Sequence, residues 1–397
     1  MNFILHIFKV HLTINYFFIK IIFKQKKQVF LLSRQNNTLS LNYKEVINNL
    51  EKENIKYKVI CKKVSTSIND SVRTQGNYSN TQGFMSKIFT NLKSVFEYYF
   101  SLHKQMAMIA SSKVIIVDGY NLPVSLFRHK KGTKVIQMWH ALGAIKKFGY
   151  QSVGKIDGIS HDVARILKMH AGYDYVLSGS VGMNPYFAEA FNVDMDKVLA
   201  IGTPTVDYLR KENKNIVKKI YKNYPSLKEK INVLYSPTFR NGQKYDYDSL
   251  IKNTDFNKVN LIITYHSKVE ETVKDRRVTC ISSSEFSVFD VLKVCDYVIT
   301  DYSALMVDAA IADKKILFYV YDYDEYEKNN GINLNLLKDF SKITSKSAKK
   351  IMDIINKNQY DNESYLRFKE MYTPHIEKTS TQEVMNLIKR CLDEKSN

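Results

Sequence analysis

Hydrophobic and polar positions change their period repeatedly along the chain. Short runs of consecutive apolar residues, typical of strands buried on both faces of a sheet, alternate with longer stretches in which apolar residues recur every three or four positions. In the first half the predicted strands are residues 28–34, 57–64, 113–120, 134–139, 173–180 and 197–204. In the second half they are residues 231–238, 259–267, 277–282, 297–303 and 315–320. This alternation predicts parallel sheets with right-handed crossover helices on both faces.

A lysine-rich helical stretch, residues 211–225, separates the two runs of strands. The pattern therefore predicts an α/β protein with two Rossmann-type, doubly wound domains that face a central cleft. We place the N-terminal domain at residues 28–210 and the C-terminal domain at residues 211–375. In open α/β sheets ligands bind beyond the carboxyl ends of the strands, so the residues that follow each strand are the candidates for a site.

The first 27 residues form a separate segment that is basic and amphipathic. It is basic because the chain has no acidic residue before Glu45. The polar residues that share one helical face are Asn2, His6, Lys9, Thr13, Lys20, Lys24 and Lys27. Lysines inside the apolar run argue against a membrane span, and no cleavage site of a signal peptide follows. We expect residues 1–27 to lie as a helix on an anionic membrane surface. A helix that docks on the domain, or a start assigned too early, is the alternative.

Residues 66–83 are predicted to be a polar loop, and residues 84–110 a long amphipathic segment. The chain carries 59 Lys and Arg against 40 Asp and Glu, a formal charge of +19, which predicts an anionic partner. That partner could be a nucleic acid, an acidic lipid surface or a phosphate-rich substrate. No phosphate-binding Gly-rich loop, zinc spacing, nucleophile elbow or Asp-rich metal motif is present, so we expect neither a metal nor a cofactor.

The strand at residues 134–139 ends in the chain's single Trp, Trp139, and is followed by His140. Gly143 permits a close turn, and Lys146 and Lys147 come directly after it. One interpretation is a general base beside cations that hold a phosphate. The other, equally weighted on this motif alone, is a histidine packed against Trp139 with solvated lysines beyond.

In the second half, Thr238 and Arg240 follow one strand and His266 ends the next. Arginine suits two-pronged phosphate binding, although a single surface arginine in a turn is the commoner case. The next polar strand end consists of Thr300, Asp301, Tyr302 and Ser303. We expect a helix to open at about Ser303, capped by that side chain, with N–H groups that bind an anion. Asp301 could hold a hydroxyl, and Asp308 lies one turn into the helix.

Three blocks, read in this order, resemble the CDP-glycerol glycerophosphotransferase family, which includes the teichoic acid primases and polymerases. They are QMWHALGAIKKFG at residues 137–149, VLYSPTFR at 233–240 and VITDYSALMVDAAIADKKILFYVYDYDEY at 298–326. The segment at residues 187–209 is similar to the family's stretch before the domain junction. The resemblance implies a GT-B fold with an N-terminal acceptor domain, a C-terminal domain for a CDP-polyol, and a C-terminal helix, residues 376–397, that packs back across.

The resemblance also implies site residues and partners. His140 occupies the position of the family's proposed general base, and His266 is the second catalytic candidate. The expected donor contacts are Thr238, Arg240, Thr300, Asp301, Tyr302, Ser303 and Asp308, and the expected acceptor contacts are Trp139, Gly143, Lys146 and Lys147. The implied acceptor is linked to polyprenyl diphosphate, and the implied location is the cytoplasmic face of the cell membrane. Many members have Gly where this chain has Ala141, and Pro where it has Ser267.

The expected reaction is attack of an acceptor hydroxyl on the β-phosphorus of CDP-glycerol, with His140 as base and CMP as leaving group. CDP-ribitol is an alternative donor. A GT-B glycosyltransferase that uses a sugar nucleotide would share the fold and the phosphate site. A nucleic-acid binder would explain the charge, but it needs a basic surface rather than histidines at strand ends. We therefore expect no nucleic-acid partner.

Overall fold

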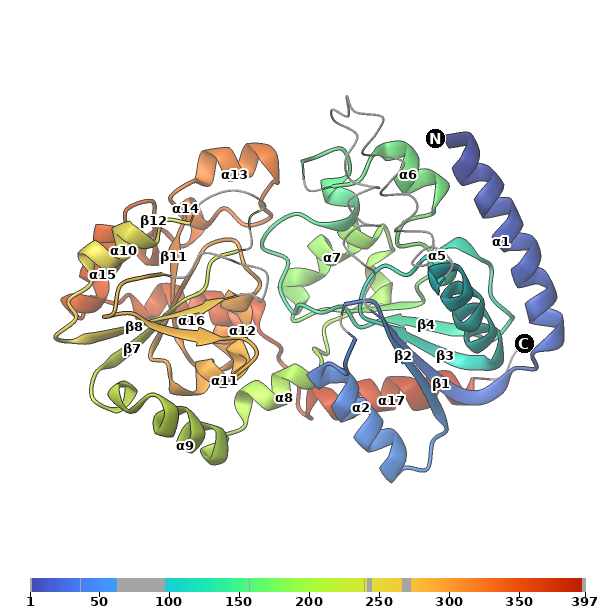
Figure 1. Cartoon of the computed structure of the whole chain (residues 1–397), viewed down its shortest axis with the longest axis horizontal. Coiled ribbons are helices and arrows are strands. Elements are labelled where there is room, and N and C mark those ends of the chain that lie inside the picture. The colour runs from blue at the N-terminus through green and yellow to red at the C-terminus, as the bar shows by residue number, and fades with distance from the viewer. Residues whose placement is uncertain are drawn as a thin grey trace.

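Each half of the chain builds its own parallel β-sheet, and the two sheets stand side by side (Figure 1). The computed structural model describes residues 2–35, 37–62, 97–156, 158–238, 240, 245–265 and 273–394. The N-terminal sheet contains β1 (Lys26–Ser33), β2 (Tyr57–Cys61), β3 (Ser112–Val117), β4 (Lys134–Gln137), β5 (Tyr175–Leu177) and β6 (Val198–Leu199). The C-terminal sheet contains β7 (Ile231–Tyr235), β8 (Val259–Tyr265), β9 (Thr279–Ser282), β10 (Tyr297–Thr300), β11 (Lys315–Tyr319) and β12 (Thr344–Ser345).

The order of the strands confirms the predicted doubly wound α/β fold. The N-terminal sheet runs β2-β1-β3-β4-β5-β6 and the C-terminal sheet runs β12-β11-β10-β7-β8-β9. In the first sheet the chain leaves β1 toward one edge and returns to continue from β3, so the order reverses between β1 and β3. In the second sheet the reversal lies between β7 and β10. Such reversals open a crevice at the carboxyl ends of the strands.

Helices cover both faces of each sheet (Figure 1). In the N-terminal half they are α1 (Asn2–Ile22), α2 (Leu41–Lys52), the helix at residues 97–111, α5 (Leu122–Leu126), α6 (His161–Ile166), α7 (Asn184–Phe191) and α8 (Pro204–Arg210). In the C-terminal half they are α9 (Lys214–Asn223), α10 (Tyr247–Asn253), α11 (Val288–Val291), α12 (Leu305–Ile311), α13 (Tyr323–Asn329), α14 (Leu336–Asp339), α15 (Ala348–Asn356), α16 (Asn362–Tyr372) and α17 (Ser380–Asp393). The predicted loop at 66–83 and the start of the amphipathic segment lie outside the described residues.

The central strands are apolar without interruption because both of their faces are buried. On β1, Val29 and Leu31 face a core cluster that includes α2 and α17, while Phe30 and Leu32 face the opposite cluster. Helix α17 thus packs under the N-terminal sheet although it follows the C-terminal one. Its side of that cluster is formed by Val384, Met385, Leu387, Ile388, Cys391 and Leu392.

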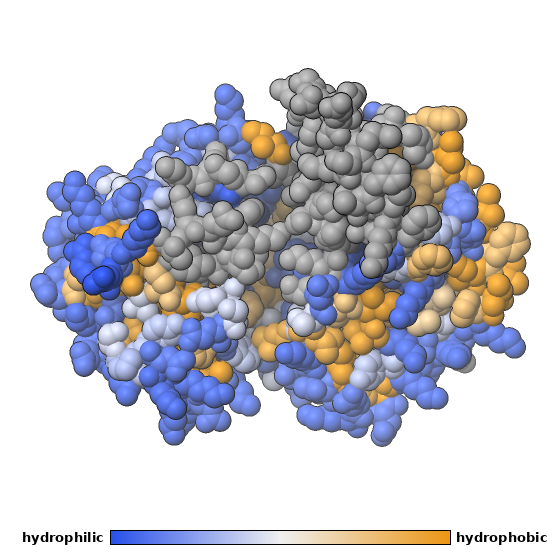
Figure 2. Space-filling model, viewed as in Figure 1, coloured by the Kyte–Doolittle hydropathy of each residue, from blue (hydrophilic) through white to orange (hydrophobic). Residues whose placement is uncertain are grey.

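Helix α1 packs with one face and exposes the other. Leu12 and Tyr16 are buried, and the Tyr16 ring stacks on Phe127 with ring centroids 4.8 Å apart. The exposed apolar side chains are Phe3, Ile7, Val10, Ile14, Phe17, Phe18, Ile21 and Ile22. Figure 2 shows apolar side chains gathered along the edge of the molecule where α1 lies in Figure 1. Within the described helices, Leu5–Ile22 is the one stretch long and apolar enough to cross a membrane by length and composition alone.

Candidate active site

A cavity of about 170 Å³ lies between the two halves of the protein, at the carboxyl ends of the N-terminal strands. Its N-terminal wall includes Asp118 after β3 and His140 after β4. Phe289 of α11 and Asp308 of α12 close it from the C-terminal half. The predicted site at the strand ends therefore has a counterpart in the structure, and both halves contribute to it.

A left-handed residue turns His140 toward this cavity. After β4 ends, Trp139 has a φ of 57°, a conformation that costs a bulky residue roughly 1–2 kcal/mol. Its N–H donates to Oε1 of Gln137 at 3.0 Å, and its ring stacks on Phe148 with centroids 5.2 Å apart. Packing thus holds Trp139 in place among aromatic neighbours, and the residue also lines the cavity.

The hydrogen bond of His140 determines which ring nitrogen can act as a base. Nδ1 lies 3.0 Å from the backbone oxygen of Asp118, which can only accept, so Nδ1 carries the proton in the neutral ring. The side-chain amide of Gln35 is a weaker second contact, 3.3 Å from the same nitrogen. Nε2 is left with its lone pair. His140 keeps an exposed edge at the cavity, but the surrounding protein atoms desolvate the ring and lower its pKa. The charge of Lys146 lowers it further, against the hydrogen bond to Asp118. The ring is therefore neutral near pH 7, as a general base must be.

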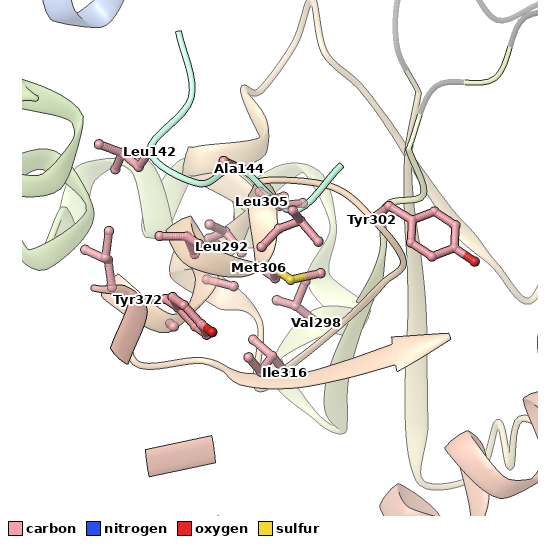
Figure 3. Close-up of a cluster of buried hydrophobic side chains, with 14 of the residues drawn as sticks. Leu142, Ala144, Leu292, Val298, Tyr302, Leu305, Met306, Ile316 and Tyr372 are labelled. Carbon is pink, nitrogen blue, oxygen red and sulfur yellow. The ribbon is translucent and has the colours of Figure 1, made fainter. Parts of the chain in front are cut away.

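The segment after His140 packs against α12 and so forms part of the contact between the two halves. A Cβ on Gly143 would lie 2.6 Å from Cγ2 of Val307, so only glycine permits this approach to α12. Figure 3 shows Ala144 beside Leu305 of α12, and Leu142 and Met306 belong to the same core cluster. Gly143 is buried in this contact, which differs from its predicted place at the acceptor.

Lys146 and Lys147 belong to the same contact through their backbones. Lys146 forms an isolated antiparallel bridge with Ile332, and the N–H of Lys147 donates to the oxygen of Gly331 at 3.0 Å. The N–H of Asn333 returns a bond of 2.7 Å to the oxygen of Ile145. The Lys146 side chain is exposed and its charge acts on His140, so of the two lysines it is the one electrostatically coupled to the cavity.

Arg240 is buried inside the C-terminal domain, contrary to the prediction that it faces a diphosphate. Its side chain is 2% exposed. Its Nη1 lies 2.7 Å from Oδ2 of Asp301, and its Nε lies 2.9 Å from Oδ2 of Asp322. Burial alone would lower the pKa of Arg240, but these carboxylates raise it above its ordinary value. Asp301 also accepts the N–H of Thr238 at 2.8 Å. The predicted donor ligands Thr238, Arg240 and Asp301 thus satisfy one another.

The rest of the predicted turn is also used internally. Thr300 donates to the oxygen of Ser236 at 2.7 Å, and the Tyr302 hydroxyl donates to Asp322 at 3.0 Å. Helix α12 begins at Leu305 rather than at Ser303, and Ser303 Oγ accepts the N–H of Leu305 at 3.2 Å. The N–H groups of Met306 and Val307 also bond within this turn, to the backbone oxygens of Ser303 and Ala304. The anion site at this helix end stays a prediction. His266 lies outside the described residues.

Asp308 faces the cavity from α12, opposite His140. Its carboxyl has no hydrogen-bond or ion-pair partner among the described residues, and burial raises the pKa of Asp308 to about 7. The structure therefore brings together His140 and Asp308, which the sequence placed in different roles. It keeps the network around Arg240 apart from them.

Asp118 was missed by the sequence reasoning. It directly follows β3 and precedes a glycine, the same signal of a polar residue at a strand end that identified His140. Burial raises the pKa of Asp118 to about 6, although hydrogen bonds from Ser33 and from the backbone oppose the shift. No group of three His, Cys, Asp or Glu suited to a metal ion occurs in the part of the chain that the structure describes.

Comparison with known proteins identifies the family of this chain and several relatives. A family model described as CDP-Glycerol:Poly(glycerophosphate) glycerophosphotransferase matches residues 14–390. The chain is 31% identical over 305 residues to the teichoic acid glycerol-phosphate primase of Bacillus subtilis (strain 168), with 73% of this chain and 77% of the relative covered. It is 29% identical over 305 residues to the teichoic acid ribitol-phosphate primase of Bacillus spizizenii, with 73% of this chain and 78% of the relative covered.

Solved structures are similar in fold. The structure of the wall teichoic acid polymerase TagF matches with a TM-score of 0.68 at 17% identity, over 98% of this chain and 97% of that chain. A UDP-GlcNAc 2-epimerase from Neisseria meningitidis matches with a TM-score of 0.51 at 12% identity, over 91% of this chain and 99% of that chain. At 17% and 12% sequence identity, these structures show that the two-domain fold is shared.

Proposed function

Because the chain belongs to the CDP-glycerol:poly(glycerophosphate) glycerophosphotransferase family, we propose that it transfers a polyol phosphate from a CDP-polyol to a hydroxyl of a lipid-linked acceptor. CMP is the second product, and the reaction belongs to the synthesis of teichoic acid or a related cell-surface polymer. Glycerol phosphate is the proposed group and ribitol phosphate the alternative, since relatives of both kinds match at similar identity. The observation that carries the proposal is His140 at a cavity between two α/β domains, with Nδ1 bonded to the backbone oxygen of Asp118 and no partner for Nε2 among the described residues.

The proposed step balances around His140. The acceptor hydroxyl gives its proton to Nε2 as its oxygen bonds to the β-phosphorus. The bond from that phosphorus to the bridging oxygen breaks, and CMP leaves with the oxygen. A positioned base typically contributes ~100- to 10,000-fold to such a rate. The N-terminal domain is proposed to hold the acceptor and the C-terminal domain the CDP-polyol.

Asp308 and the Arg240 network have different proposed roles on the donor side. Asp308 in its protonated form can donate a hydrogen bond to a phosphate oxygen, whereas its carboxylate would repel it. Arg240, held between Asp301 and Asp322, fixes the loops after β7 and β10 that border the donor. His266 remains the proposed contact for the leaving phosphate.

Attachment to the cytoplasmic face of the membrane is proposed for α1. Three cations, Lys20, Arg128 and Lys130, lie at the end of its exposed apolar stripe. Lys20 donates to the backbone oxygen of Arg128 at 3.0 Å, and Lys130 donates to the backbone oxygen of Phe23. A helix with an apolar stripe and flanking cations binds the interface of an anionic bilayer. The opposite face of α1 is part of the domain core, so the proposed anchor positions the whole domain.

The experiment that tests the reaction is CMP release by the purified protein given CDP-glycerol or CDP-ribitol, with and without a lipid-linked acceptor. Acceptor-dependent release from one donor supports the proposal and names the polyol. Consumption of a UDP-sugar, with silence toward both CDP-polyols, would replace it with a glycosyltransferase.

A further inference from the structure

The geometry points to a hydroxyl-binding subsite in the N-terminal wall of the cavity, formed by Asp118, Thr203 and Asn42, that holds the terminal polyol or sugar unit of the acceptor beside His140. This inference rests on the proposed function and adds the residues that select the acceptor. It moves the acceptor's reacting end away from Gly143 and Lys147, which lie in the domain contact.

Two buried polar atoms in this wall have no hydrogen-bond partner among the described residues. Asp118 is 5% exposed and Thr203 is 2% exposed, and neither Oδ1 of Asp118 nor Oγ1 of Thr203 makes a hydrogen bond. Both residues line the cavity. Buried polar groups in folded proteins are nearly always paired, and each exception calls for a reason such as a ligand or a water molecule. Two exceptions on one cavity wall indicate that a polar molecule completes them.

The topology brings the subsite residues to the place where this fold binds ligands. Asp118 follows β3, which lies next to β1 at the point where the strand order reverses. Thr203 precedes α8, and Asn42 lies in the first turn of α2. Asn42 Oδ1 accepts both the N–H and the hydroxyl of Thr205 at 2.8 Å, which fixes the amide. Its nitrogen donates to none of the described residues and can serve the ligand.

The chemistry of the cavity favours hydroxyl groups over phosphates. Among its described lining residues there is no Lys or Arg, whereas two carboxyl groups, Asp118 and Asp308, are present. On the N-terminal wall the carboxylate of Asp118 would repel a phosphate, but together with a hydroxyl and an amide it satisfies the paired donor and acceptor of each alcohol. Trp139 and Phe289 add apolar surface for the carbon skeleton. The cavity's 170 Å³ leaves room for one polyol unit.

The acceptor hydroxyl that reacts lies at the mouth of this subsite, between Nε2 of His140 and the donor. Asp118 contributes twice: its backbone oxygen orients His140, and its side chain binds a neighbouring hydroxyl. Lys146 is not among the residues that line the cavity, but its charge acts on His140.

The test is the Thr203→Val variant, because valine keeps the shape and removes only the unpartnered hydroxyl. We expect the acceptor KM to rise about five- to tenfold, the KM for the CDP-polyol to stay within about twofold, and the melting temperature not to fall. Thr344→Val is the matched control, since Thr344 is also buried with an unpartnered hydroxyl but lies in β12, away from the cavity. Asp118→Asn should raise the acceptor KM by at least as much.

An unchanged acceptor KM in both Thr203→Val and Asp118→Asn, with wild-type turnover intact, overturns the subsite and leaves the proposed function standing. A wild-type protein that is silent with every CDP-polyol contradicts the proposed function instead. Binding of glycerol, ribitol and methyl glycosides, followed by NMR line broadening, then tests the subsite without turnover. Binding that weakens in both variants but not in Thr344→Val supports it, and equal or absent binding in all of them overturns it.

Discussion

Nδ1 of His140 lies 3.0 Å from the backbone carbonyl oxygen of Asp118, and this contact links two neighbouring strand ends into one catalytic arrangement. The carbonyl holds the proton on Nδ1 and so directs the basic Nε2 away from the protein backbone. A side-chain carboxylate in that position would raise the pKa of the histidine more strongly. The backbone oxygen orients the ring while leaving it neutral near pH 7.

The pH dependence of the reaction follows from two titratable groups that line the same cavity, His140 and Asp308. Activity requires neutral His140, whose pKa is held below its ordinary value, and in our proposal protonated Asp308, whose pKa is raised to about 7. We predict a bell-shaped profile of kcat/KM whose alkaline limb lies near pH 7. Asp308→Asn keeps a hydrogen-bond donor at every pH, so its profile should lose the alkaline limb and keep the acid one. An unaltered alkaline limb in Asp308→Asn would show that another group titrates.

The same carboxyl makes stability depend on pH. The folded-state pKa of Asp308, about 7, is above its unfolded value of about 3.9, so its contribution is complete below pH ~4 and is lost as the pH rises to 7. We predict that Asp308→Asn is more stable than wild type by up to ~4 kcal/mol above pH 7, with little difference at pH 4. Denaturant unfolding at several pH values measures this, and a constant difference between the two proteins would contradict it.

Arg240 is expected to affect stability rather than donor binding. Removing the guanidinium leaves the buried Asp301 and the partly buried Asp322 without a counter-ion, and an unpaired buried charge typically costs about 3–5 kcal/mol. We therefore predict a sharp fall in the melting temperature of Arg240→Ala, and a smaller one for Arg240→Lys, which keeps the charge but not the two-pronged geometry. A stable Arg240→Lys protein whose only defect is a raised KM for the CDP-polyol would restore the phosphate-binding role.

Gly143 is predicted to be intolerant of any side chain because of a contact with the other domain. A Cβ there would lie 2.6 Å from Cγ2 of Val307, and overpacking of this kind costs about 1–3 kcal/mol. Gly143→Ala should lower the stability of the protein and its kcat, since the loop that carries His140 must shift. Val307→Ala removes the clashing methyl groups, so the double variant should recover part of the loss. Failure of Val307→Ala to rescue Gly143→Ala would place the constraint elsewhere.

Membrane binding is predicted to depend on the outer face of α1. Phe17 is 56% exposed on the apolar stripe, so Phe17→Ser should weaken binding to phosphatidylglycerol vesicles about 10- to 100-fold while the domain stays folded. Leu366→Ser is the matched control, because Leu366 is 59% exposed on α16, at a distance from α1. Co-sedimentation measures both. Equal loss in the two variants, or none in either, would remove α1 as the anchor.

The strands and their carboxyl ends were predictable because burial on both faces leaves a plain signal, an uninterrupted apolar run such as residues 113–117. His140 was found in the same way, as a polar residue directly after such a run. The left-handed backbone conformation of Trp139, which orients His140, could not be found in this way. It depends on packing against Phe148 and against residues farther along the chain.

Arg240 shows why the donor side was harder. Whether an arginine after a strand meets a ligand or a buried carboxylate depends on Asp301 and Asp322, which only the sheet brings beside it. The helix was predicted to open at about Ser303; α12 begins at Leu305, and Ser303 Oγ accepts the N–H of that first residue. Asp118 carried the right local signal, and its importance became visible only when β3 and β4 were placed next to each other.

The central claim is that this chain moves a polyol phosphate onto an acceptor with His140 as base, and transfer of label from CDP-[¹⁴C]glycerol or CDP-[¹⁴C]ribitol into extractable lipid tests it most directly. Wild type and His375→Ala, a variant of an exposed histidine outside the cavity, should transfer label equally. Folded His140→Ala should be slower by about 100-fold or more. Near-full transfer by His140→Ala, or no transfer of either label by wild type with several acceptors, would contradict the claim.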